Sequence, residues 1–274
     1  MAGKRNSEST DRQTNNKKRR FHSDGTPVWG NRIGPGVWVT CVKGKERQAV
    51  GELHDLFDSL ASELWPEQDA NLSEEDEGLS IEEQIKKELS TIKKPGAKKR
   101  FVNLKTDTTC AIFISCRPPV DPVTLIETHI ANVQKTGIAR TKFCHRFVPV
   151  SASCVTNIPE IQGLCRAVLD PWFAKEPERK FTYKIEIRTR NHTNPGRDIL
   201  IKTVAACVPE VHTVNLTNPE VFILVEVFKS TFSISVTKEY YNLLKYNVVE
   251  IAARYAKEHG TSGEEPAKPQ TDAA

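Results

Sequence analysis

A strand pattern that runs directly into a pair of arginines constrains the fold more than any other feature of this 274-residue chain. Between residues 181 and 187 every second side chain is apolar, and polar side chains stand between them. Successive side chains of a strand point to opposite faces, so this alternation predicts a half-buried strand. Arg188, Arg190 and Asn191 follow at its end. Planar guanidinium groups and an amide suit phosphate and sugar oxygens, so the segment predicts a contact with nucleic acid.

The residues after this turn predict the remainder of an α/β unit. Apolar residues at 199, 201 and 204 have helical spacing. Residues 221–227 are almost continuously apolar, which is typical of a central strand that is covered on both faces. Residues 232, 234 and 236 then alternate with polar residues, so another strand follows.

The first half of the chain predicts a second kind of unit. A short apolar strand at residues 37–42 is followed by helical spacing from Ala49 to Leu64. Two short strands at 101–104 and 111–114 precede a helix between Pro122 and Gly137, and residues 147–150 form a strand. The order strand, helix, strand, strand, helix, strand is that of a ferredoxin-like unit, which by itself says nothing about function.

Composition divides the chain further. The net charge is only +4, but positive residues are concentrated before residue 33 and acidic and basic blocks alternate between 66 and 100. We therefore expect a disordered basic tail at 1–33, a ferredoxin-like domain at 34–150 with a charged insertion at about 66–100, a second domain at 151–250 and a C-terminal tail at 251–274. The run from Lys17 to Arg20 suits nuclear import or added phosphate affinity. We expect a protein of the nucleolus or nucleoplasm, with a cytoplasmic pool as an alternative.

The candidate RNA contacts are the cations and polar groups at strand ends. A single exposed Lys or Arg is weak evidence for an RNA site, because such residues are common on any protein surface. Several of them gathered in one place are stronger evidence. Tyr246 can supply a stacking face for a base or pack against the preceding helix. The predicted RNA-binding residues are Arg140, Lys142, Arg146, Arg188, Arg190, Asn191, Lys229, Lys245 and Tyr246.

Catalytic and cofactor signatures are weak. The sequence contains neither a dinucleotide fingerprint nor a P-loop, and the nearest approach to an acetyl-CoA loop, residues 48–53, ends in the bulky Leu53. Cys144 and His145 are adjacent, but adjacency does not aim two side chains at one substrate. Seven cysteines without a Cys-x-x-Cys pair, and no apolar signal segment, favour a soluble, reduced intracellular protein. We expect no catalytic residue, no metal and no cofactor.

Several short motifs carry a family resemblance. Thr189-Arg190-Asn191, the stretch 214–219 and the stretch 225–230 resemble a THUMP domain, an RNA-binding module of tRNA-modifying enzymes. Lys245-Tyr246-Asn247, together with residues 46–49 and 79–89, is similar to the stand-alone THUMP proteins that serve as adaptors for the tRNA cytidine acetyltransferase. The resemblance covers roughly residues 34–250.

The resemblance implies an adaptor without its own active site. It implies that the chain presents serine and leucine tRNAs to a separate RNA cytidine acetyltransferase, which forms N4-acetylcytidine in the D-arm. The alternatives are a fragment of a THUMP-type tRNA-modifying enzyme and a general RNA chaperone. An enzyme would need a further nucleotide-binding domain, for which the chain has no room, and the RNA and protein that co-purify would separate the remaining two.

Overall fold

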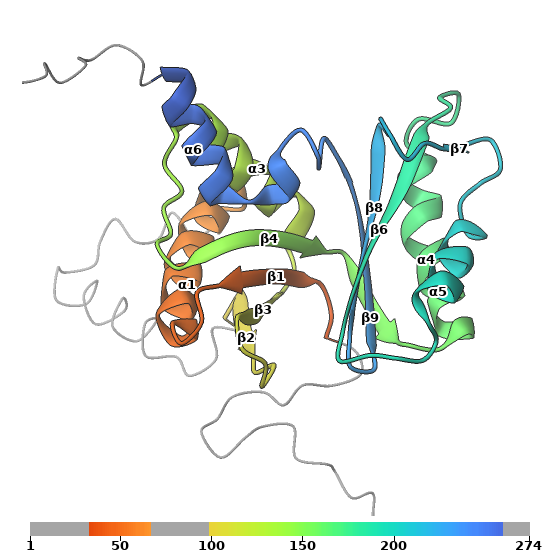
Figure 1. The fold of residues 1–274 in the computed structure, drawn as a ribbon, viewed down its shortest axis with the longest axis horizontal. Coiled ribbons are helices and arrows are strands. Elements are labelled where there is room, and N and C mark those ends of the chain that lie inside the picture. The colour runs from red at the N-terminus through yellow and green to blue at the C-terminus, as the bar shows by residue number, and fades with distance from the viewer. Residues whose placement is uncertain (1–32, 67–98, 260–274) are drawn as a thin grey trace, which may run out of the picture.

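The structure, a computed structural model, describes residues 33–66 and 99–259. The predicted basic tail, most of the charged insertion and the chain beyond residue 259 lie outside the described residues. Two β-sheets lie side by side, and their strands run in different directions in the view of Figure 1. The predicted α/β fold with a ferredoxin-like first unit is confirmed.

The first sheet has four antiparallel strands in the order β2-β3-β1-β4. Helix α3 begins with a cap, because the carboxylate of Asp121 accepts a hydrogen bond from the Thr124 amide at 2.9 Å, and it ends at Gly137 with a φ of 72°. The elements are β1 (Gly36–Cys41), α1 (Glu46–Leu64), β2 (Phe101–Leu104), β3 (Ala111–Cys116), α3 (Pro122–Thr136) and β4 (Cys144–Val150).

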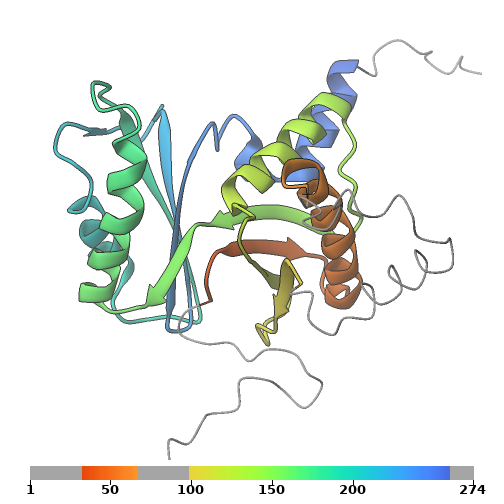
Figure 2. The same ribbon diagram turned by 180° about the vertical axis from the view of Figure 1, so that it is seen from behind.

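The second sheet has five strands in the order β5-β9-β8-β6-β7. β6 runs parallel to both of its neighbours, while the other pairs are antiparallel. Two helices cover the face that points away from the first unit (Figure 2). The elements are β5 (Ala152–Val155), α4 (Ile158–Phe173), β6 (Thr182–Arg190), α5 (Arg197–Ala205), β7 (Thr213–Val214), β8 (Val221–Phe228) and β9 (Thr231–Lys238).

Strand β8 joins the two cores, in keeping with its almost continuous apolar run, which predicts a strand covered on both faces. Its odd-numbered residues from Val221 to Val227 pack beneath α4 and α5. Phe222, Leu224 and Phe228 on its other face belong to the core of the first unit. The ring centroid of Phe228 lies 5.1 Å from that of Trp38 on β1. The face of the second sheet that meets the first unit is therefore buried, and Glu226 lies on this face between two apolar residues.

The predicted tail is wrong over residues 251–259. Helix α6 (Val248–His259) follows a short turn, η2 (Leu244–Tyr246), and packs against α3. Val248 and Ile251 are buried in the first core because apolar residues recur at helical spacing on one side of this helix. The chain thus returns to its first unit after completing the second. None of the helices in the described residues is long and apolar enough to cross a membrane.

Candidate nucleic-acid interface

Two of the predicted RNA contacts, Arg140 and Lys142, lie on the loop between α3 and β4. The guanidinium of Arg140 donates to the hydroxyl of Ser59 on α1 at 3.1 Å. The backbone amide of Lys142 donates to the carboxylate of Glu52, also on α1, at 3.1 Å. Both side chains are exposed, so they remain open to solvent beside α1.

Three other predicted arginines come together around one carboxylate. Arg146 on β4 and Arg188 and Arg190 on β6 surround Glu226 of β8, and we call these four residues the arginine cluster. The Nε atom of Arg188 lies 3.8 Å from a carboxylate oxygen of Glu226. The Arg190 guanidinium lies over the ring of Trp38, 5.9 Å from its centroid. Parallel pairing sets Arg188 directly beside Glu226, so strand register rather than sequence distance builds this site.

Burial dominates the electrostatics of the cluster. Glu226 is only 7% exposed, and desolvation raises its pKa to about 7, although Arg190, Arg188 and Arg146 act in the opposite direction. Desolvation also lowers the pKa of the Arg190 guanidinium, which Glu226 partly opposes. The Nε atom of Arg146 is buried without a hydrogen-bond partner among the described residues. A half-buried guanidinium with an unused donor is suited to binding an anion.

The turn beyond β6 extends the cluster. Asn191 is exposed and has a φ of 52°, and Lys229 opposite it has a φ of 54°. The Lys229 amide donates to the carbonyl of Arg190 at 3.0 Å, and its Nζ donates to the carbonyl of Thr106 in the first unit at 3.1 Å. Lys229 therefore bridges the two units. The ring of His192 is held between the carbonyls of Lys229 and Pro195, at 2.8 and 3.1 Å.

A cavity of about 320 Å³ opens beside the cluster, and it includes an arginine that the sequence analysis did not select. Arg197, the first residue of α5, donates to the carbonyl of Ile187 and reaches the cavity from the edge of β6. The Pro195-Gly196 helix start before it was the signal that could have found it. The polar lining comprises Glu186, Arg188, Thr189, Arg197, Glu226 and Tyr240.

Tyr246 does not join this site, whereas Lys245 lies close to its rim. Tyr246 is fully buried and its hydroxyl donates to the carbonyl of Lys238 at 3.4 Å, so the prediction that it contacts RNA is wrong. Its ring packs edge-on against Tyr240 in the first core, because η2 turns it inward. Lys245 is exposed, and its ammonium lies 5.0 Å from the ring centroid of Tyr241, whose hydroxyl donates to Glu186 of the cavity lining.

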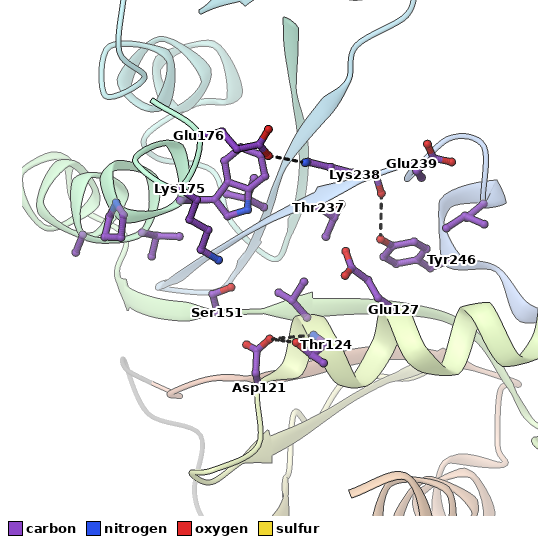
Figure 3. A pocket seen from close by; sticks show the side chains of 17 residues that line it. Asp121, Thr124, Glu127, Ser151, Lys175, Glu176, Thr237, Lys238, Glu239 and Tyr246 are labelled. Carbon is purple, nitrogen blue, oxygen red and sulfur yellow. Dashed lines mark hydrogen bonds and ion pairs between the residues drawn. The ribbon is translucent and has the colours of Figure 1, made fainter. Parts of the chain in front are cut away.

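A larger cavity of about 710 Å³ lies between α3, α4 and β9, but its charge does not suit RNA (Figure 3). Lys238 is already paired with Glu176 at 3.2 Å. Burial raises the pKa of Glu127, with Asp121 as a further cause. Carboxylates outnumber ammonium groups in the lining, which includes Asp121, Glu127, Glu176, Glu239, Lys175 and Lys238. A phosphate backbone favours a positive surface, so the cavity beside the arginine cluster is the better RNA site.

The candidate catalytic groups lie in the core. The Cys144 thiol is buried, 3.8 Å from the carbonyl of Ala49, and burial raises its pKa, so the reactive thiolate is disfavoured. Leu53, the last residue of the segment compared with an acetyl-CoA loop, is fully buried within α1.

Comparison with known proteins agrees with this architecture. Residues 155–237 match the THUMP domain family, a segment that includes β6, β8 and most of β9. The tRNA acetyltransferase TAN1 of Saccharomyces cerevisiae is 30% identical over 279 residues, which cover 92% of this chain and 95% of TAN1. An uncharacterized protein of Schizosaccharomyces pombe is 32% identical over 217 residues, or 79% of this chain and 75% of that protein. The chain belongs to the THUMP-domain family that includes TAN1.

Other members of this THUMP family are longer. Mouse THUMP domain-containing protein 1 is 28% identical over 227 residues, which cover 79% of this chain but 64% of the mouse protein. The family resemblance predicted from the short motifs is therefore confirmed. In this chain, Arg188 and Arg190 lie in the segment that matches the THUMP domain family, residues 155–237, whereas Arg146 lies in the ferredoxin-like unit.

Proposed function

We propose that this THUMP protein is a tRNA-binding adaptor for a separate RNA cytidine acetyltransferase. The observation that carries the proposal is the arginine cluster with the cavity beside it, because Arg188 and Arg197 line this cavity while Arg146 and Arg190 act on the same Glu226. Phosphate contacts of this kind supply most of the affinity of an RNA-binding surface and depend little on sequence. Family membership supports a role in tRNA modification.

The substrates we propose are serine and leucine tRNAs, and the product is N4-acetylcytidine in the D-arm. In this proposal the chain contributes no catalytic group. It holds the tRNA at a fixed position, which raises the concentration of the target cytidine at the active site of the partner. The alternatives remain a THUMP-type enzyme fragment, which would act alone, and an RNA chaperone, which would have no dedicated partner.

Binding to purified serine tRNA tests the RNA site. Replacing both Arg188 and Arg197 with Gln should weaken binding and reduce its salt dependence. Each lost phosphate contact makes the negative slope of log K against log salt shallower by about 0.7 to 0.9. Gln removes the positive charge without reversing it beside Glu226. The matched control replaces Arg140 and Lys142 with Gln. If the control loses binding and the first variant does not, the interface lies beside α1 instead.

Mass spectrometry of tRNA tests the adaptor role. Incubated alone with tRNA and acetyl-CoA, the protein should form no acetylcytidine, and addition of the acetyltransferase should produce the mark on serine and leucine tRNAs. Cells without this protein should lose the tRNA mark and keep the mark on ribosomal RNA. Acetylation by the protein alone would contradict the adaptor role and favour an enzyme.

We also propose a nuclear location, which rests on the basic run from Lys17 to Arg20. A fluorescent fusion should accumulate in the nucleus, and replacing the four residues with Gln should release it to the cytoplasm. An unchanged distribution would assign the run to another role, such as phosphate affinity.

A further inference from the structure

Glu226 is a buried carboxylate that the proposed RNA contacts do not use. It lies on β8 beside Arg188 and is 7% exposed, on a face that otherwise buries Phe222, Leu224 and Phe228. An ionised group in such a place is costly unless it is paired and hydrogen-bonded. The nearest cation distance to its carboxylate, 3.8 Å to the Nε of Arg188, is long for a hydrogen bond.

Charged and titratable groups from β4, β6, α5 and the segment after β9 face Glu226. Glu186, on β6, is engaged by the ammonium of Lys184 at 3.3 Å and by the hydroxyl of Tyr241. Glu226 is therefore the carboxylate that opposes the arginines of the cavity. The titratable groups that face it are Arg188, Arg190 and Glu186 from β6, Arg146 from β4, Arg197 from α5 and Tyr240 from the segment after β9.

We propose that the cavity beside Glu226 takes one phosphodiester of the bound RNA and that Glu226 gains a proton from solvent when this phosphate binds. The inference rests on the proposed RNA-binding function and specifies its chemistry. A phosphate that occupies the donors of Arg188 and Arg197 offsets the positive charge that stabilises the ionised carboxylate. It also places a second negative charge near Glu226, and like charges disfavour ionisation.

Near neutral pH the free protein can take up a proton at Glu226 when phosphate binds, because part of this carboxyl group is still ionised there. Burial holds the pKa of Glu226 at about 7, so roughly half of the carboxyl groups are ionised there, and a bound phosphate raises this pKa further. The RNA complex thus contains more protons than the separate molecules. Linkage then requires affinity to be highest at low pH and to fall as pH rises through the pKa of the free protein.

Calorimetric titration with purified serine tRNA measures the proton directly. At pH 7, titrations in two buffers of different ionisation enthalpy should show uptake of about half a proton per tRNA by the wild-type protein. Between pH 6 and pH 8 the affinity should fall roughly fivefold to tenfold, and one proton limits the slope to about tenfold per pH unit. Glu226→Gln, which is neutral at every pH, should remove this uptake and bind at pH 8 about as tightly as the wild type at pH 6.

The matched control is Glu127→Gln. Glu127 is another carboxyl group whose pKa is raised by burial, but it lies in the larger cavity, away from the arginine cluster. This variant should keep the wild-type affinity and proton uptake. Protons taken up elsewhere in the complex are common to all three proteins, so only the difference between variants reports on Glu226.

The outcomes separate this inference from the proposed function. If the wild type does not bind tRNA even at pH 6 and low salt, the RNA-binding proposal fails. If it binds but takes up no proton, or if Glu226→Gln takes up as many protons as the wild type, only the inference about Glu226 is wrong. Should Glu226→Gln not fold, Glu226→Met, which also carries no titratable group and suits the apolar face of β8, takes its place in the same comparison.

Discussion

At the scale of single residues, one carboxylate shows how position determines chemistry. Glu226 has an ordinary glutamate side chain, yet strand pairing with β6 and contact with the first sheet remove it from water. The arginines that face it are restrained by the same contacts, since Arg190 lies over Trp38. Charge reversal of these arginines would place a second negative charge beside the buried Glu226, which is why neutral substitutions are the cleaner test of RNA binding.

Glu226 should make stability depend on pH even without RNA. Its pKa in the folded state, about 7, lies above the usual value of 4.5, so the folded protein binds protons more tightly than the unfolded chain. The contribution of Glu226 to the free energy of unfolding is therefore fully present below pH 4.5 and is lost as the pH rises through about 7. Relative to Glu226→Gln, the wild type should lose on the order of 3 kcal/mol between pH 4.5 and pH 8. Urea unfolding at several pH values measures this, and parallel pH profiles of the two proteins would contradict it.

Two glycines should respond oppositely to alanine. Gly137 has a φ of 72°, and a Cβ there would lie 2.4 Å from a ring carbon of Tyr255, so Gly137→Ala should destabilise the fold by about 1 to 3 kcal/mol. Gly51 lies within α1, and no heavy atom lies within 4 Å of a Cβ placed there. Gly51→Ala should stabilise by about 0.5 to 1 kcal/mol. Equal melting temperatures of the two variants would contradict the contrast between these two positions.

At the scale of elements, α6 is the segment that the sequence analysis missed and the first core needs. Its buried residues close the core beside α3, and Tyr255 covers the end of that helix at Gly137. Helix α6 follows the second unit in sequence but belongs to the first in space (Figure 1). The first unit is therefore incomplete until the whole second unit has been made.

Substitutions along α6 should show which side carries the stability. Ile251 is 1% exposed, so Ile251→Ala should cost about 2 to 4 kcal/mol through lost burial and the cavity left behind. Val249, two residues earlier, is 47% exposed, and Val249→Ala should change stability by less than about 0.5 kcal/mol. Chemical denaturation of both variants checks the contrast. Similar effects would mean that α6 does not pack on α3 in solution.

At the scale of the whole molecule, the two units share β8. Its alternate side chains belong to different cores, and Ser235 of the neighbouring strand donates to the carbonyl of Pro149 in β4 at 2.7 Å. Lys229 adds a contact with the turn after β2. Neither core is complete without this strand, so the arginine cluster between the units is held in one geometry.

Unfolding should therefore be a single cooperative step. Phe228→Ala should destabilise both units together by about 3 to 5 kcal/mol, because the ring fills the first core from a strand of the second sheet. Val214→Ala, at a side chain that is 59% exposed, is the matched control and should change little. Hydrogen exchange resolved by segment should show β1 and β9 losing protection at the same denaturant concentration. Two separate transitions would show that the units unfold independently.

Much of the fold was predictable because local patterns agree with the tertiary structure. Alternation in β6, the apolar run of β8 and the capped start of α3 at Asp121 each reflect a local rule about side-chain direction or backbone hydrogen bonding. Helix α6 escaped because only Val248 and Ile251 among its residues are buried, and its apolar side gains meaning only against α3. The same limit applies to Tyr246, whose burial depends on the turn that η2 makes.

The sequence by itself determined most of the elements, the family and the kinds of residue that could contact RNA. Only the tertiary structure decided which of those residues meet. Arg146, Arg188 and Arg197 come from β4, β6 and α5, and Glu226 among them comes from β8. The physical reason is that strand register and the packing of one sheet against another set distances between residues far apart in the chain. Those distances, together with burial, determine whether a charged side chain is a free surface group, a buried partner or part of a binding site.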